Sequence, residues 1–127
     1  MEKKRILVVD DEAIVRVSCE RVLVPEGFSV RVISRGSEAL DLLTREPYDL
    51  VITDLKMPDM DGLEILKNIK SRWPHITVIL ITGYGKASVA EQAVKQGAYE
   101  YLEKPFTPDD ILRVVKKALE HQGTSDD

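Results

Sequence analysis

The chain has 127 residues, 43% hydrophobic and 31% charged, a composition typical of one globular domain with its own core. The formal net charge of −4 argues against direct binding of nucleic acid, and no stretch is long and apolar enough to span a membrane. The single cysteine, Cys19, excludes an internal disulfide, and we expect it to be a small buried hydrophobe. The first apolar run is too short for a signal peptide, so we expect a cytoplasmic protein.

Five short apolar runs predict five β-strands. Runs of this kind, without polar alternation, are typical of strands that are buried on both faces of a parallel sheet. The predicted strands cover residues 5–9, 28–33, 49–53, 77–82 and 99–103.

The stretches between these runs have the spacing of amphipathic helices. Ser37 is a plausible N-cap, Gly97 is a natural residue just beyond a helix end, and Pro108 suits the first position of a helix. Strands and helices alternate, so we predict an α/β fold, a doubly wound five-stranded parallel sheet with five helices. The predicted helices cover residues 12–24, 37–45, 63–72, 86–96 and 108–120.

Polar residues mark the ends of four predicted strands. Asp10 and Asp11 follow the first run, and Asp54 follows the third. Thr82 ends the fourth run, and Lys104 follows the fifth. Because the carboxyl ends of neighbouring parallel strands meet at one edge of the sheet, these side chains are expected to lie close together.

Three carboxylates in one small pocket repel one another. At a separation of roughly 4 Å and an effective dielectric constant near 20, each like-charge pair costs about 4 kcal/mol. Hard carboxylate oxygens are the ligands that suit Mg²⁺. If the first and third strands are neighbours, the sequence therefore predicts a Mg²⁺ site at this edge.

Four motifs occur in order at the strand ends. They are Val8-Val9-Asp10-Asp11-Glu12, Asp54-Leu55-Lys56-Met57-Pro58-Asp59-Met60-Asp61-Gly62, Thr82-Gly83, and Lys104-Pro105-Phe106 with Tyr101 shortly before it. Over residues 4–121 the chain thereby resembles the receiver domain of bacterial two-component response regulators. The resemblance implies a flavodoxin-like (βα)5 receiver fold, with residues 122–127 as a polar tail or the start of a linker.

The resemblance also implies the roles of the acidic residues. Asp54 would be the phosphorylation site. Mg²⁺ would be bound by Asp11, Asp54 and the main-chain carbonyl of Lys56, with Asp10 acting mostly through water.

On the same grounds, Lys104 would pair with the phosphoryl group and be followed by a cis peptide bond. Thr82 and the small residue Gly83 would contact a phosphoryl oxygen, and the Tyr101 ring would turn inward when the threonine moves. Two rim positions would tune the lifetime of the acyl phosphate, namely Lys56 and Tyr84.

The function that the resemblance implies is a phosphorylation-activated signalling switch. A histidine kinase would supply the phosphoryl group, and the surface of the fourth helix, fifth strand and fifth helix would control an output domain or partner protein. That surface is also a candidate for a phosphorylation-dependent homodimer. The module would assist only its own phosphorylation and slow dephosphorylation, so it is not expected to be an enzyme.

The sequence segment from Asp54 to Pro58 resembles the corresponding segment of nitrogen-regulation-type transcriptional activators. No DNA-binding element follows residue 121, so we expect either a stand-alone receiver or the receiver of a longer regulator.

Two other classes of protein remain as alternatives. An aspartyl-phosphate phosphohydrolase would carry a second acidic residue two positions after the nucleophile, where this chain has Lys56. A flavin-mononucleotide carrier would need a phosphate loop rich in hydroxyls and glycines after the first strand, where this chain has acidic residues that repel phosphate.

Overall fold

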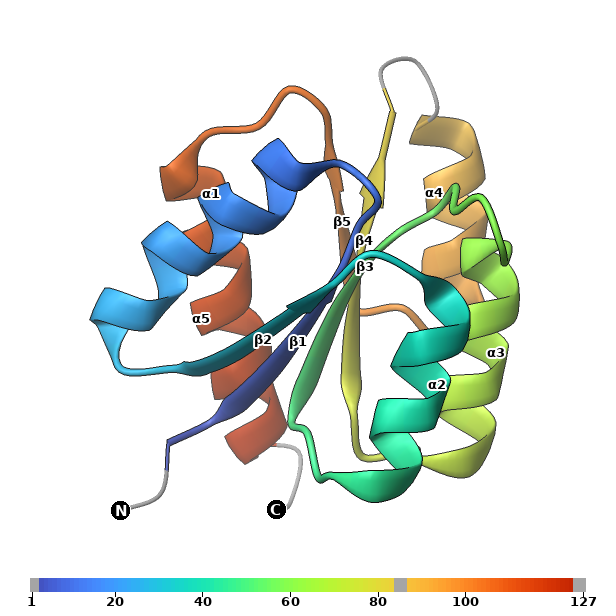
Figure 1. The fold of residues 1–127 in the computed structure, drawn as a ribbon, viewed down its shortest axis with the longest axis horizontal. Coiled ribbons are helices and arrows are strands. Elements are labelled where there is room, and N and C mark those ends of the chain that lie inside the picture. Colours follow the sequence, from blue (N-terminus) through green and yellow to red (C-terminus); the bar gives the residue numbers. More distant parts are fainter. Residues whose placement is uncertain (1–2, 84–86, 125–127) are drawn as a thin grey trace.

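The fold is a five-stranded sheet covered by helices on both faces (Figure 1). The computed structural model describes residues 3–83 and 87–124. All neighbouring strands are parallel, in the order β2-β1-β3-β4-β5, which confirms the predicted doubly wound sheet. The strands are β1 (Arg5–Val9), β2 (Ser29–Ile33), β3 (Leu50–Asp54), β4 (Thr77–Thr82) and β5 (Glu100–Glu103).

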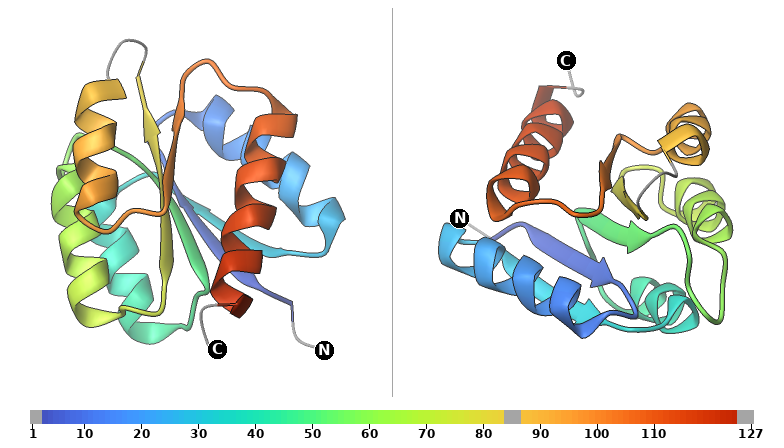
Figure 2. Two further views of the ribbon diagram at one scale, coloured as in Figure 1. Left: turned by 180° about the vertical axis from the view of Figure 1, so that it is seen from behind. Right: turned by 90° about the horizontal axis from the view of Figure 1, so that it is seen from above.

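The helices form two layers, with α1 and α5 on one face of the sheet and α2, α3 and α4 on the other (Figures 1 and 2). Between α1 and β2 the chain makes a short 3₁₀ turn, η1 (Val24–Glu26), which contains Pro25 and ends at Gly27 with a positive φ of 97°. The α-helices are α1 (Ala13–Leu23), α2 (Gly36–Arg45), α3 (Gly62–Arg72), α4 (Ala87–Lys95) and α5 (Pro108–Thr124).

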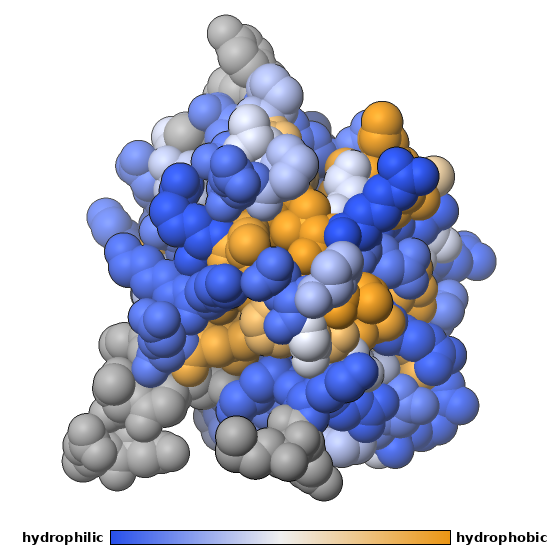
Figure 3. Space-filling model, turned by 90° about the vertical axis from the view of Figure 1, so that its left-hand side faces the viewer, coloured by the Kyte–Doolittle hydropathy of each residue, from blue (hydrophilic) through white to orange (hydrophobic). Residues whose placement is uncertain are grey.

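The core is divided by the sheet into two clusters. Alternate side chains of each central strand point to opposite faces, so Leu7 and Val9 pack toward α2, α3 and α4, whereas Ile6 and Val8 pack toward α1 and α5. Cys19 is fully buried in the second cluster, as predicted, and burial raises the pKa of its thiol to about 12. The face with α1 and α5 also shows apolar surface among its charged side chains (Figure 3).

Several predicted boundaries shift by a few residues. Helix α2 begins at Gly36, so Ser37 is inside its first turn and the prediction of Ser37 as the N-cap is wrong. Helix α5 continues to Thr124, beyond the predicted end at residue 120. Helix α4 begins at Ala87, and Lys86 lies outside the described residues. Gly97 follows α4 with a positive φ of 122°, and Pro108 is the first residue of α5, as predicted.

Candidate functional site

The strand order brings the predicted site residues to one edge of the sheet. Val9 pairs with Thr53, so Asp10 and Asp54 come next on adjacent strands. Strand β4 lies on the other side of β3 and ends at Thr82. Strand β5 lies beyond it, and Lys104 follows at its end.

Three carboxylates gather at this edge, and two of them, Asp10 and Asp54, are among the three that the sequence predicts. Oxygen atoms of Asp10, Glu12 and Asp54 lie within 4.8 Å of one another. We call these residues the acidic group. Asp10 is completely buried and Asp54 is 6% exposed, whereas Glu12 and Asp11 are exposed. Glu12 is not among the ligands that the family resemblance implies, although it directly follows the two aspartates in the sequence. Asp11 does not belong to the acidic group.

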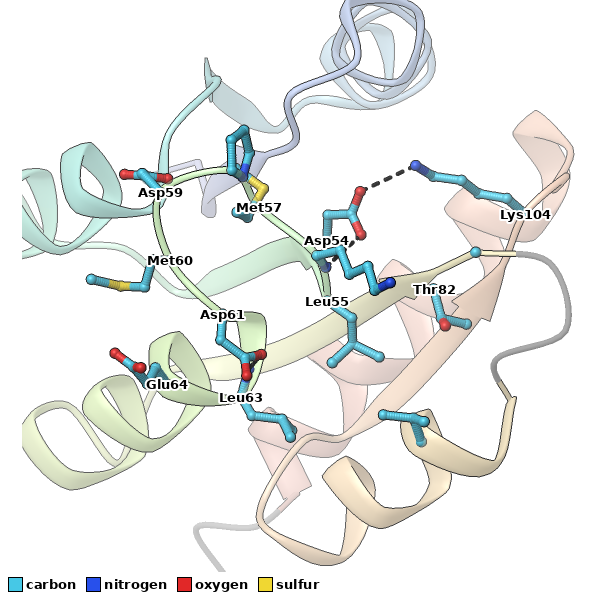
Figure 4. Close-up of a pocket in the computed structure, with 14 residues that line it drawn as sticks. Asp54, Leu55, Met57, Asp59, Met60, Asp61, Leu63, Glu64, Thr82 and Lys104 are labelled. Atoms are coloured by element: carbon cyan, nitrogen blue, oxygen red, sulfur yellow. Dashed lines mark hydrogen bonds and ion pairs between the residues drawn. The ribbon is translucent and has the colours of Figure 1, made fainter.

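The Lys104 side chain points toward Asp54 (Figure 4) and pairs with all three carboxylates of the acidic group. Its Nζ lies 3.2 Å from Oδ2 of Asp54 and 3.6 Å from Oδ2 of Asp10, and it also pairs with the Glu12 carboxylate. Burial alone would lower the pKa of the Lys104 ammonium, but these carboxylates together raise it well above its ordinary value. Lys104 therefore remains protonated at physiological pH.

Asp10 is the most deeply buried member of the acidic group. Burial raises the pKa of its carboxyl to about 6, and the charges of Asp54 and Glu12 act in the same direction. One oxygen, Oδ1, accepts a hydrogen bond from the backbone N–H of Glu12 at 2.8 Å. The other, Oδ2, makes no hydrogen bond within the described residues, only the longer ion pair with Lys104. A buried anionic oxygen without a donor is well suited to receive a cation.

The loop between β3 and α3 shapes the chain next to Asp54. Its backbone closes in an isolated antiparallel bridge between Lys56 and Asp61, and Oδ1 of Asp54 accepts from the Lys56 N–H at 3.0 Å. Gly62 makes this close approach feasible, because a Cβ there would lie 2.5 Å from the Cα of Leu55 and 2.6 Å from the carbonyl oxygen of Asp54. A glycine is therefore required at the start of α3.

An open cavity of about 770 Å³ lies beside Asp54, between the β3–α3 loop and α4 (Figure 4). Thr82, Gly83, Lys56 and Lys104 line it together with Asp54, so the structure brings these predicted residues together. The remaining lining residues are Leu55, Met57, Pro58, Asp59, Met60, Asp61, Leu63, Glu64 and Val89.

The other predicted site residues lie near this cavity or outside the described part of the chain. Tyr101 is half-buried on β5 and packs against the cluster beneath α4. The peptide bond between Lys104 and Pro105 is cis, as predicted. Tyr84 lies outside the described residues.

Comparison with known proteins identifies the family. The sequence pattern of the response regulator receiver domain matches residues 6–116. The chain belongs to the response regulator receiver family. It is a module of phosphorylation-dependent two-component signalling, and neither the phosphohydrolase nor the flavin carrier is favoured.

Curated relatives of this receiver include both long and short proteins. It is 38% identical over 121 residues to the DNA-binding transcriptional regulator NtrC of Proteus hauseri, covering 95% of this chain and 26% of that protein. It is 40% identical over 119 residues to the sporulation initiation phosphotransferase F of Bacillus subtilis, covering 94% of this chain and 96% of that protein. The receiver thus spans about a quarter of the NtrC relative and nearly all of the phosphotransferase.

A solved structure supports the same fold. The CheY-like receiver domain protein from Methanospirillum hungatei JF-1 superposes with a TM-score of 0.91 at 32% identity, covering 98% of this chain and 99% of that one. In the described part of this receiver, no helix has the length and apolar character needed to cross a membrane.

Proposed function

We propose that Asp54 accepts the phosphoryl group of this receiver and that a histidine kinase is the donor. The proposal is supported by a buried carboxylate that is paired with a lysine beside an open cavity. Oδ2 of Asp54 lies 3.2 Å from Nζ of Lys104. A carboxylate oxygen can act as nucleophile toward phosphorus. The P–N bond to the donor histidine breaks as a P–O bond to Asp54 forms, which gives an acyl phosphate.

Lys104 provides the counter-charge for this transfer. Charge in the transition state spreads over the equatorial phosphoryl oxygens, and a protonated ammonium beside them is stabilising. Lys104 already touches Asp54, so it needs only a small reorientation to follow the phosphoryl group.

The acidic group fits a divalent cation, which we propose to be Mg²⁺. The carboxylates of Asp10, Glu12 and Asp54 carry −3 when ionised, and Lys104 supplies +1, which leaves −2. When bound, Mg²⁺ neutralises phosphoryl oxygens during transfer. The proposed ligands are Asp10, Asp11, Asp54 and the main-chain carbonyl of Lys56, and the proximity of Glu12 makes it a further candidate.

The output surface of the receiver is proposed to be α4, β5 and α5. Thr82 would contact the phosphoryl group, and the Tyr101 ring would occupy the space that Thr82 leaves. An output domain, a partner protein or a second receiver would bind this surface in the cytoplasm. The receiver would act on itself alone, with Lys56 and Tyr84 tuning slow hydrolysis of the acyl phosphate and Gly83 leaving room for the phosphoryl oxygens.

The direct test is phosphorylation of the purified chain. Incubation with acetyl phosphate and Mg²⁺ is expected to add one phosphoryl group, measured by intact mass, and excess EDTA is expected to prevent it. A histidine kinase labelled on its histidine should transfer its phosphoryl group in the same way. No mass change with either donor in the presence of Mg²⁺ would refute the proposal.

Mg²⁺ is expected to raise the melting temperature of the unphosphorylated chain, because a ligand that binds only the folded state stabilises it by about 2.7 kcal/mol at a hundredfold excess over its Kd. Asp11→Asn should reduce this gain. Asp41→Asn is the matched control, because Asp41 is an exposed aspartate that pairs with Arg45 on α2. Thermal melts across a Mg²⁺ series measure the effect.

Two results would change the ligand set. An equal gain in wild type and Asp11→Asn would remove Asp11 from it. A gain that Glu12→Gln abolishes and Asp11→Asn leaves intact would put Glu12 in its place.

A further inference from the structure

We infer that Asp59 is a positioning residue of the phosphorylation site, because it ties the loop after Asp54 to the N-terminus of α2. The inference rests on the proposed function of Asp54 and on the proposed role of the Lys56 main-chain carbonyl as a cation ligand. Asp59 lies on the β3–α3 loop, on the side away from Lys104 (Figure 4). We call its contacts with Gly36 and Ser37 the clasp.

The clasp consists of hydrogen bonds from the first turn of α2 to one carboxylate. The Gly36 N–H donates to Oδ1 of Asp59 at 3.0 Å. The N–H and the Oγ–H of Ser37 donate to Oδ2 at 3.0 and 2.8 Å. The first N–H groups of a helix have no partner within the helix and carry partial positive charge, so they bind an anion well.

Asp59 thus caps the N-terminus of α2, whereas the residue directly before the helix does not. The N-cap residue of α2 is Arg35, whose side chain makes no capping hydrogen bond. The bonds from the Ser37 and Gly36 backbones, together with the Ser37 hydroxyl, lower the pKa of the Asp59 carboxyl to about 2. The carboxylate therefore remains ionised, and the clasp persists, across the neutral pH range.

Close packing of α2 against the loop accompanies the clasp. Gly36 is buried, and a Cβ at this position would lie 2.8 Å from Cδ1 of Ile65 and 3.0 Å from Cβ of Met60. A larger residue at position 36 would require the Ile65 side chain and Met60 to shift. The absence of a side chain at Gly36 and the charge of Asp59 therefore both favour close packing of α2 against the β3–α3 loop.

The clasp acts on the phosphorylation site because the loop is short and attached at both ends. Lys56 and Asp61 form the bridge at its base, and the Gly62 N–H donates to the Leu55 carbonyl at 2.8 Å. Asp59 adds a third attachment between them. Losing it leaves the Lys56 backbone held by the bridge to Asp61 and by the hydrogen bond from its N–H to Asp54. We expect the Lys56 carbonyl then to sample more orientations and to bind a cation less well.

The clasp also links the segment before α2, which contacts Asp10, to the loop that follows Asp54. The Asp10 N–H donates to the Ile33 carbonyl at the end of β2, at 3.1 Å, and the chain enters α2 three residues later at Gly36. Asp59 fastens the loop after Asp54 to this same segment.

The test is Mg²⁺ affinity in Asp59→Ala. Supporting contacts around metal ligands typically change affinity by 10- to 100-fold, and we expect the lower end, an increase in Kd of about tenfold. At saturating Mg²⁺ the rate of phosphorylation by acetyl phosphate should return close to that of wild type, because Asp59 touches no reacting atom. Asp59→Asn keeps one carbonyl acceptor and should give an intermediate Kd. Titration calorimetry measures Kd, and intact mass against time measures the rate.

Asp110→Ala is the matched control. Asp110 caps the start of α5 by accepting from the Thr107 N–H at 2.9 Å, and it lies on a different helix from the clasp. Both variants should lower the melting temperature, but only Asp59→Ala should raise the Kd. A lower melting temperature with a wild-type Kd in Asp59→Ala would make Asp59 a helix cap and nothing more. A wild-type chain that does not bind Mg²⁺ at all would overturn the proposed cation site, and the inference with it.

Discussion

Asp54→Asn is expected to abolish phosphorylation of this receiver, because a neutral amide has no anionic oxygen to attack phosphorus. The substitution keeps the size of the side chain, and the Asn oxygen can still accept from the Lys56 N–H. Lys104 also keeps its partners Asp10 and Glu12. The fold should therefore persist while the acceptor is lost. After incubation with acetyl phosphate and Mg²⁺, intact mass should show no phosphoryl group.

The control for this experiment is a measurement of whether the variant is folded. Asp54→Asn removes one charge from a crowded acidic group, so its melting temperature should be equal to or above that of wild type, measured without Mg²⁺. Asp41→Asn, on the surface of α2, should be phosphorylated like wild type. Labelling of Asp54→Asn to the wild-type extent would place the acceptor elsewhere.

Thr82→Ala is expected to separate phosphorylation from its output. Thr82 is 1% exposed and ends β4 next to Asp54. We propose that its hydroxyl contacts a phosphoryl oxygen. Asp54 and Lys104 remain, so the variant should still take up a phosphoryl group. Phosphorylation can shift α4 and β5 only through an interaction whose free energy differs between the two conformations of the receiver. Without the hydroxyl, we expect most of that shift to be lost.

Amide NMR with beryllofluoride, which stands in for the phosphoryl group, measures the shift. In wild type, residues 87–103 should change, and in Thr82→Ala they should respond weakly. Thr82→Ser keeps the hydroxyl and should restore the response. An alanine variant that responds as fully as wild type would show that Thr82 is not the switch.

Much of the fold was predictable because its signals are local. Strands such as Leu50–Asp54 lie in the middle of a sheet covered on both faces, so every residue is buried and the first three residues form an apolar run without polar alternation. Pro108 and Gly97 marked helix ends by their own backbone preferences. The location of the site also follows from the parallel strands, because their carboxyl ends meet at one edge of the sheet and bring Asp10, Asp54 and Thr82 together.

The errors came from contacts between distant segments. Ser37 looks like an N-cap in isolation, but the cap of α2 comes from Asp59, 22 residues away. The Glu12 carboxylate lies with those of Asp10 and Asp54, and its cationic partner Lys104 is far away in the sequence. Such contacts depend on tertiary packing and leave no periodic pattern in the sequence.

The division of the core by the sheet has a consequence for how this receiver can diverge. Tyr101 packs in the cluster beneath α2, α3 and α4, whereas Phe106 packs in the cluster beneath α1 and α5. Substitutions in separated clusters act nearly independently. A core substitution beneath α1 should therefore leave the packing beneath α3 nearly unchanged, and the reverse. Lys104 lies on the chain between Tyr101 and Phe106, so the segment that carries it is anchored by packing in both clusters.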